Sequence, residues 1–176
     1  MRRVSTLFAT SLLVVFLSAC NGKVTGGGTI PSVAGDDSKA AFTLTGDSCK
    51  GKVKGKFTLV DQKAAYPGGL RLSGDSTGVM RCLEEQFIGE IPPCTDCPAG
   101  TVQFSFDYKS NNKSMPGDGR GFACVTDNGQ GRNGTPDLVS VTLVDGPYIG
   151  YTTGGELKGN LRVSSCKDDE LPDLSL

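Results

Sequence analysis

Cysteine is the residue type in this chain whose chemistry is most specific. The sequence has seven cysteines and no histidine. Two of them form the motif Cys94-Thr95-Asp96-Cys97, and this spacing is typical of thiol–disulfide exchange sites. Redox enzymes place such a motif at the start of a helix, which lowers the pKa of the first thiol. Here prolines flank the motif on both sides and no helical pattern follows, so the motif favours a structural bridge within a loop.

The absence of histidine limits the catalytic chemistry open to the chain. It excludes Ser-His-Asp and Cys-His catalysis and every zinc site that needs imidazole. An enzyme would have to use carboxylates, lysine, tyrosine or a metal held by oxygen ligands. The adjacent residues Glu84 and Glu85 do not suit acid–base catalysis, because neighbours on a strand point to opposite faces. We therefore expect a protein that is not an enzyme.

Four residues with side-chain oxygens in one glycine-rich segment could bind calcium: Asp127, Asn128, Asn133 and Asp137. Calcium takes about six to eight oxygen ligands from such side chains and from backbone carbonyls. The spacing does not match the calcium loop of roughly twelve residues, which closes with a glutamate. The alternative is a tight turn, which Asp-Asn-Gly sequences favour. No other cofactor is expected.

The first twenty residues have the layout of an export signal. Arg2 and Arg3 precede an apolar stretch over residues 7–17. That stretch is shorter than the about 20 apolar residues of a membrane-spanning helix and fits the core of a signal peptide. It leads into the sequence Leu-Ser-Ala-Cys, which ends at Cys20. One interpretation is an ordinary secretory signal in which the cysteine is incidental.

The other interpretation is that this ending resembles the lipobox of bacterial lipoproteins. The resemblance implies that the chain is cut before Cys20, that the Cys20 thiol is diacylated, and that the protein is exported and anchored to the cell envelope. At least two acyl chains are needed for firm membrane attachment. Asn21 follows the cysteine, where Gram-negative lipoproteins of the inner membrane commonly have aspartate, so the resemblance implies an outer-membrane location.

Without Cys20, six cysteines remain, and an even number in an exported chain predicts three disulfides. The alternation of side chains favours certain pairs. Cys124 is expected to face inward together with Phe122, which suits a buried bridge. The first and last of the six cysteines lie just beyond the first and last clear strands. We therefore expect the pairs Cys49–Cys166, Cys82–Cys124 and Cys94–Cys97.

Most of the remaining chain alternates apolar and polar residues with a period of two. Glycine, at 25 of 176 residues, is about twice as frequent as in average proteins and marks many turns. No segment longer than about one turn has helical spacing. The chain is predicted to be all-β, an antiparallel sandwich or small barrel of about seven strands stapled by disulfides. The expected strands cover residues 39–45, 53–59, 70–82, 101–108, 121–126, 139–143 and 157–163.

We expect four segments along the chain. They are a signal peptide over residues 1–19, a flexible tether over 20–38, a β domain over 39–166 and a disordered acidic tail over 167–176. Residues 26–31 could instead lie against the domain as an edge segment. Removal of Arg2 and Arg3 leaves 16 basic and 19 acidic residues. This balance provides no basic face for nucleic acid, and it predicts no membrane contact beyond the lipid.

The later half of the chain also resembles a known module. Residues 122–131, 137–141 and 154–161, together with residues 26–30, resemble the post-COAP type of β-module found in exported bacterial proteins. Those modules have an Asp-Asn-Gly turn, a closing Gly-x-Leu-x-Gly-Asn strand and a Gly-Gly-Gly-x-Ile start. The added cysteines and an insertion over residues 83–100 depart from that pattern. The resemblance implies an all-β exported module and assigns no activity.

Several functions remain open. The first is a lipid-anchored, non-enzymatic module that binds a protein or an envelope polymer. The second is an inhibitor of a lysozyme or protease with residues 83–100 as its inhibitory loop, because rigid loops lose less entropy on binding. The third is a calcium-binding surface module. An enzyme that uses carboxylates and a metal would instead show turnover sensitive to EDTA.

Overall fold

The computed structural model describes residues 22–81, 86–87, 96–97, 100–129 and 134–167. Within these residues the chain is built from strands. None of them forms a helix long and apolar enough to span a membrane. The described strands are β1 (Gly22–Ser32), β2 (Gly35–Asp47), β3 (Lys54–Asp61), β4 (Leu70–Arg81), β5 (Gln86–Phe87), β6 (Asp96–Cys97), β7 (Thr101–Ser110), β8 (Asp118–Thr126), β9 (Leu138–Leu143), β10 (Thr152–Glu156) and β11 (Lys158–Ser165).

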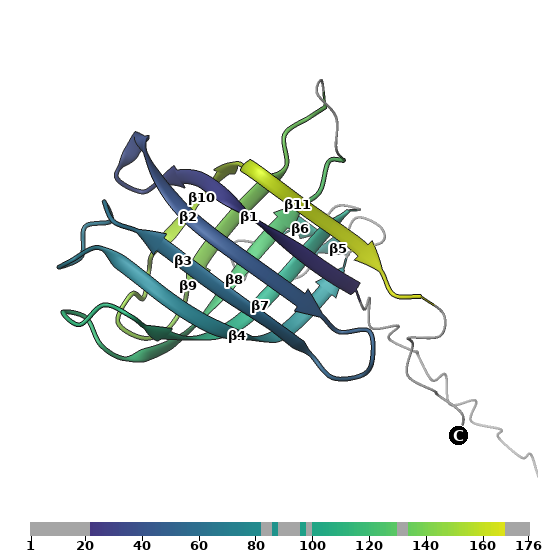
Figure 1. Cartoon of the computed structure of the whole chain (residues 1–176), viewed down its shortest axis with the longest axis horizontal. Coiled ribbons are helices and arrows are strands. Elements are labelled where there is room, and N and C mark those ends of the chain that lie inside the picture. The colour runs from purple at the N-terminus through teal and green to yellow at the C-terminus, as the bar shows by residue number, and fades with distance from the viewer. Residues whose placement is uncertain (1–21, 82–85, 88–95, 98–99, 130–133, 168–176) are drawn as a thin grey trace, which may run out of the picture.

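Nine of these strands form one antiparallel sheet in the order β10-β9-β8-β7-β4-β3-β2-β1-β11. The strands β10 and β11 lie at its two edges, yet only Leu157 separates them in sequence. This segment pairs first with β9 and then with β1, so the sheet curls into a nearly closed, barrel-like structure (Figure 1). The predicted all-β fold is confirmed, with nine strands in the main sheet rather than about seven.

The antiparallel order gathers different segments at the two ends of the barrel (Figure 1). One end holds the start of β1, the β2–β3 loop, and the ends of β4 and β11; we call it the Gly22 end. The other holds the β1–β2 turn and the β3–β4, β7–β8 and β9–β10 connections; we call it the Asp61 end.

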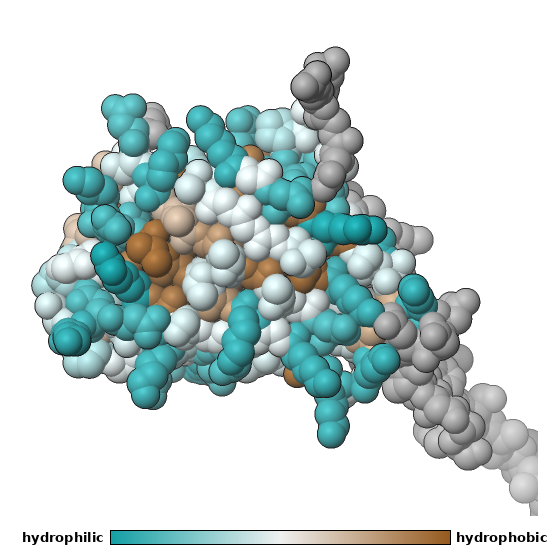
Figure 2. Space-filling model, viewed as in Figure 1, coloured by the Kyte–Doolittle hydropathy of each residue, from teal (hydrophilic) through white to brown (hydrophobic). Residues whose placement is uncertain are grey.

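Hydrophilic side chains surround the outer face of β1 to β4, and an apolar area lies inside that rim (Figure 2).

Apolar side chains alternate as predicted along β7 and fill the interior of the barrel. Phe104, Phe106 and Tyr108 of this strand are buried. The ring of Phe106 stacks on that of Phe57 from β3, with centroids 4.1 Å apart. Each fully buried ring of this kind stabilises the fold by roughly 1.5–3 kcal/mol. The same inward alternation is confirmed for Ala40, Phe42, Leu44, Leu59, Leu70, Leu72, Val102, Val139, Val141, Leu143 and Leu161.

The orientation predicted for β8 is wrong. Ala123 faces the core, whereas Phe122 and Cys124 are half-buried on the outer face. The neighbouring aromatic rings explain the difference, because a Cβ on Gly121 would stand 2.6 Å from Cζ of Phe106. Small inward residues on β8 therefore leave room for the rings that β7 directs into the core.

The flexible tether predicted over residues 20–38 is wrong where the structure describes it. Residues 22–32 form β1, which lies between β2 and β11, and residues 35–38 belong to β2. The glycines that suggested a linker instead permit close strand packing, since a Cβ on Gly28 would stand 2.4 Å from the carbonyl oxygen of Lys158. The segment is thus an interior strand, which neither the tether nor the edge interpretation predicted.

The start of the second predicted strand is also wrong. Val53 was expected on the core face, but β3 begins at Lys54, whose pairing with β2 starts opposite Asp47. Val53 lies outside the sheet in the β2–β3 loop and is 38% exposed. Because the chain turns over residues 49–52, Val53 has no strand partner to bury it.

Candidate functional site

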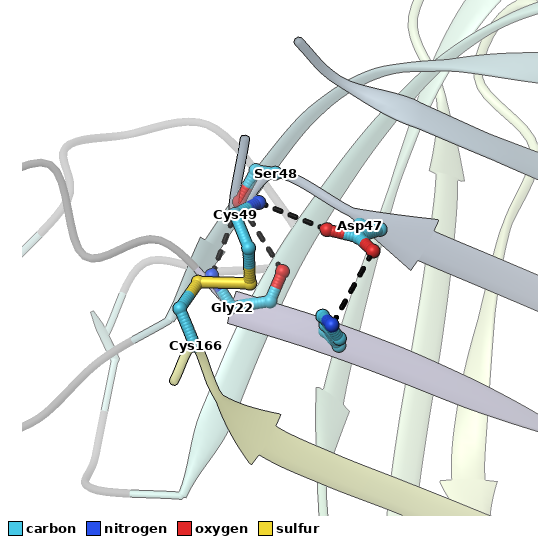
Figure 3. Close-up of polar contacts among 6 residues, drawn as sticks. Gly22, Asp47, Ser48, Cys49 and Cys166 are labelled. Atoms are coloured by element: carbon cyan, nitrogen blue, oxygen red, sulfur yellow. Dashed lines mark hydrogen bonds and ion pairs between the residues drawn. A yellow bond between two sulfur atoms is a disulfide. The ribbon is translucent and has the colours of Figure 1, made fainter. Parts of the chain in front are cut away.

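The Gly22 end is held by hydrogen bonds around the first described residue (Figure 3). The N–H of Gly22 donates to Oγ of Ser48 at 3.1 Å, and the N–H of Ser48 donates to the carbonyl oxygen of Gly22 at 3.1 Å. The Ser48 hydroxyl also reaches the carbonyl oxygen of Val79 at 3.1 Å. The start of β1 is therefore fixed to β2 and β4, and Cys20, which lies outside the described residues, precedes this fixed point by two positions.

A disulfide completes this end of the barrel. Cys49 and Cys166 are bonded, which confirms the predicted pair and ties the β2–β3 loop to the end of β11. Cys124 is disulfide-bonded as well. Its expected partner Cys82 lies outside the described residues, as does Cys94, the expected partner of Cys97. The pairs Cys82–Cys124 and Cys94–Cys97 therefore stay predictions, and so does inhibition by the loop over residues 83–100, most of which is also not described.

The oxygens of the predicted calcium site accept hydrogen bonds from the backbone. One carboxylate oxygen of Asp127 accepts from the N–H of Gly129 at 2.9 Å, and the other accepts from the N–H of Val163 at 2.8 Å. Asp137 accepts from the N–H of Asn128 at 2.9 Å. Among the described residues no three acidic or sulfur- or imidazole-bearing side chains form a metal cluster.

This arrangement fits the tight-turn interpretation of the Asp-Asn-Gly segment. Asn128 also donates from its amide nitrogen to the carbonyl oxygen of Pro136 at 2.6 Å, which ties the two arms of the segment together. Asn133, the fourth predicted ligand, lies outside the described residues. Residues 127–129 and 134–137 thus form a strap, which holds the end of β8 against β11.

Among the described residues, part of β11 has no neighbouring strand on the side that faces away from β1. The N–H of Leu157 donates to the carbonyl oxygen of Asp137 at 2.8 Å, and the N–H of Val163 donates to Asp127. Both amides point away from β1. In an antiparallel pair, alternate residues direct their backbone groups to the same side. Gly159 and Leu161 occupy the alternate positions between Leu157 and Val163, so their amides and carbonyls must also point away from β1.

We call the outward backbone of Gly159 and Leu161 the open edge of β11. No hydrogen bond within the described residues reaches their backbone from this side. Two hollows of about 290 Å³ and 240 Å³ lie along the edge, between β11 and the strap. Unpaired strand amides and carbonyls are a template for an additional strand. The sequence alone did not predict this edge. Alternation of apolar and polar residues predicts a strand, but it does not show whether another strand pairs with each side of it.

Strand register also brings together two carboxylates that sequence analysis did not connect. Asp75 of β4 lies opposite Asp107 of β7, in an outer groove of about 500 Å³. Both residues are exposed, and Asp75 forms an ion pair with Lys56. A carboxyl group that works as a general acid at neutral pH normally lies in an apolar, buried setting. The groove is therefore better suited to contact with a charged partner.

The Asp61 end uses its polar groups internally. The carboxylate of Asp61 is fully buried. It accepts hydrogen bonds from the hydroxyl groups of Ser32 at 2.7 Å and Tyr151 at 2.9 Å. The N–H groups of Lys63 and Ala64 donate to it at 3.1 Å each. Four groups from three connections thus converge on one carboxylate, which makes Asp61 a structural residue that sequence patterns do not distinguish from a surface aspartate.

Tyrosines pack around this carboxylate. Burial raises the pKa of Tyr151 far above its ordinary value, and the negative charge of Asp61 raises it further. Burial, followed by the neighbouring Tyr148, also raises the pKa of Tyr66. The rings of Tyr66 and Tyr148 meet edge to face with centroids 5.1 Å apart. Tyr66 and Tyr151 therefore stay neutral at physiological pH and act as packing and hydrogen-bonding groups.

No protein-family model, curated protein or solved structure matches this chain. The resemblances to bacterial lipoproteins and to post-COAP modules therefore stay predictions. Function has to be inferred from the residues and their geometry.

Proposed function

We propose that this chain is a bacterial envelope lipoprotein, held by lipid on Cys20, whose β domain binds a protein partner without catalysing a reaction. The layout of residues 1–20 supports export and lipidation. The Cys49–Cys166 disulfide is compatible with an oxidising compartment outside the cytoplasm. Asn21 supports sorting to the outer membrane.

The open edge of β11 carries the binding part of the proposal. Gly159 and Leu161 turn their backbone groups into a groove instead of toward a neighbouring strand. A partner that supplies an extended segment can form main-chain hydrogen bonds there, which is the β-augmentation mode of peptide recognition. This observation favours a protein partner over an envelope polymer, because a polysaccharide cannot continue the alternating ladder of a sheet.

Site-specific photo-crosslinking in living cells tests the binding proposal. A photoreactive residue replaces the exposed Arg162, beside the open edge, and a control replaces the exposed Thr43 on the outer face of β2. We expect one envelope protein to be captured from position 162 and not from position 43. Mass spectrometry of the crosslinked peptide should place an extended partner segment along β11. Equal capture at both positions, or none at position 162, would contradict the proposal.

Mass spectrometry of the mature N-terminal peptide tests the anchor. The wild-type chain should begin at Cys20 and carry at least two acyl chains. The Cys20→Ala variant should carry none and should be released from the membrane fraction. An unmodified Cys20 in the mature wild-type protein would contradict lipid attachment while leaving the binding experiment valid.

A further inference from the structure

The distance between the proposed lipid and the folded domain is short. Gly22 is fixed in the barrel by its hydrogen bonds with Ser48. Cys20 lies two residues earlier, and two residues span at most about 7 Å. If Cys20 carries lipid, as the proposed function states, the Gly22 end must lie at the level of the lipid headgroups. The residues exposed at this end then decide how the domain meets the membrane.

Among the described residues, the exposed charged side chains of the β2–β3 loop at the Gly22 end are all basic. The β2–β3 loop carries Lys50 and Lys52, and Lys54 follows at the start of β3; all three are exposed. The exposed Val53 lies between the last two. The loop is attached to the fixed point itself, since Ser48 binds Gly22 and the next residue forms the disulfide to β11. These lysines therefore lie on the same end of the barrel as the lipid attachment point.

The basic residues continue from this loop onto the outer face of the sheet. A groove of about 480 Å³ is lined by Lys23, Lys54 and Arg162, and Asp47 is the only acidic residue among its described lining residues. Asp47 is already engaged, because it lies 3.7 Å from Lys23 and accepts the N–H of Cys49 at 2.9 Å. The groove thus keeps a net positive charge.

Arg81 adds an independent observation. Its side chain lies directly beside Gly22, since a Cβ on Gly22 would stand 3.1 Å from the Cβ of Arg81. The Nε of Arg81 is buried and has no hydrogen-bond partner. Its guanidinium adds a positive charge next to the point where the chain leaves toward Cys20, and its buried Nε itself is closed to a lipid phosphate.

We propose that the Gly22 end is a membrane-binding face that recognises anionic phospholipid headgroups. We call it the basic anchor face and define it as Lys23, Lys50, Lys52, Lys54, Arg81 and Arg162. Electrostatic attraction acts over a Debye length of about 8–10 Å, which exceeds the about 7 Å that two residues can span between Cys20 and Gly22. Val53 supplies an apolar contact between two lysines. The net charge of the whole chain hides this face, because the chain has 19 acidic residues against 18 basic ones.

Vesicle sedimentation tests the basic anchor face without any lipid on the protein. The test uses the full mature chain with Cys20→Ala, so that the acidic residues after Lys167 contribute their charge as well. We expect binding to vesicles with equal parts of phosphatidylcholine and phosphatidylglycerol, and no binding to vesicles of phosphatidylcholine alone. Binding should weaken as salt is added.

Charge reversal locates the face. Each basic residue near an anionic surface contributes about fivefold to binding, so K50E/K52E should lower the vesicle partition coefficient by about 25-fold or more. The matched control is K63E/K113E, which changes the net charge equally on exposed residues of the Asp61 end. This control should lower the coefficient much less, because its residues lie at the opposite end of the barrel.

Equal losses in the two double variants would overturn the proposal, since they would show a response to net charge alone. Binding to a soluble polyanion such as heparin that matches binding to anionic vesicles would also overturn it, and would assign the face to an acidic polymer. The assay is independent of acylation and of the open edge of β11. A negative vesicle result would therefore not contradict the proposed function. Likewise, the absence of acyl chains on Cys20 would not change the vesicle result.

Discussion

The two ends of the barrel hold their strand ends in place by different kinds of interaction. At the Gly22 end a disulfide joins residues 117 positions apart, and the lysines point outward to solvent. At the Asp61 end a buried carboxylate accepts hydrogen bonds from several connections. The disulfide leaves polar side chains free for other contacts. The hydrogen-bonded cluster around Asp61 uses the hydroxyl groups of Ser32 and Tyr151 within the fold.

Removal of the disulfide should have the largest effect. Bridging residues so far apart stabilises a protein by about 4–5 kcal/mol through the entropy of the unfolded chain. The variant C49S/C166S should lose that amount in urea unfolding followed by tyrosine fluorescence, with D75A as a surface control near zero. A loss below about 1 kcal/mol would mean that strand pairing alone fixes the Gly22 end, and the contrast between the ends would disappear.

Asp61→Ala should come next. The substitution leaves the hydroxyl groups of Ser32 and Tyr151 and two backbone N–H groups buried without their acceptor. Breaking a buried charged network of this kind costs about 3–5 kcal/mol. Urea unfolding under non-reducing conditions should show this loss while the Cys49–Cys166 disulfide, mapped by peptide mass, stays intact. A loss as small as that of Asp75→Ala would show that solvent already reaches Asp61.

High pH should weaken the Asp61 end selectively. The pKa of Tyr151 is raised above its ordinary value of 10.0 in the folded protein, so above pH 10 the unfolded chain releases a proton that the folded protein retains. Stability is therefore fully present below pH 10 and falls as the pH rises, by about 1.4 kcal/mol per pH unit for this tyrosine.

Tyr151→Phe separates this effect from general alkaline denaturation. The variant should lose about 2 kcal/mol at neutral pH with its hydrogen bond to Asp61, and its stability should decline less steeply above pH 10. Unfolding curves at several alkaline pH values give both numbers. If wild type and variant decline with the same slope, Tyr151 is not the group that links stability to pH.

Calcium should have the smallest effect. A site with a dissociation constant one hundredth of the calcium concentration would add about 2.7 kcal/mol, a rise of several degrees in Tm. Because Asp127 and Asp137 already accept backbone N–H groups, we expect calcium to shift Tm by less than about 1 °C. A rise of several degrees that disappears in Asp127→Asn would instead establish the calcium site and make the strap a ligand-dependent element.

Sequence patterns correctly predicted the features that depend on a single strand and its ends. Alternation along β7 predicted its core residues because one buried face imposes a period of two. The position of Cys49 and Cys166 just beyond the first and last clear strands predicted their bond. These inferences need only the strand itself and its ends.

The features that the sequence did not predict depend on contacts between neighbouring strands. A glycine-rich segment is equally compatible with a linker and with a crowded interior strand, and only the approach of β11 to Gly28 decides for β1. The inward face of β8 depends on the rings of β7. The burial of Asp61, the meeting of Asp75 with Asp107 and the open edge of β11 all follow from register and connectivity, which no single stretch of sequence contains.

The pairing of β1 with β11 has a consequence for the order of folding. Of the described strands, β1 is the first to be synthesised and β11 the last, and Gly22 pairs with Ser165. The barrel therefore closes only after β11 has been synthesised, and the non-local contact makes closure a late and slow step. Until then one edge of β1 is exposed to other chains. Premature termination before residue 158 would leave that edge permanently unpaired and should yield aggregates in place of a shorter folded domain.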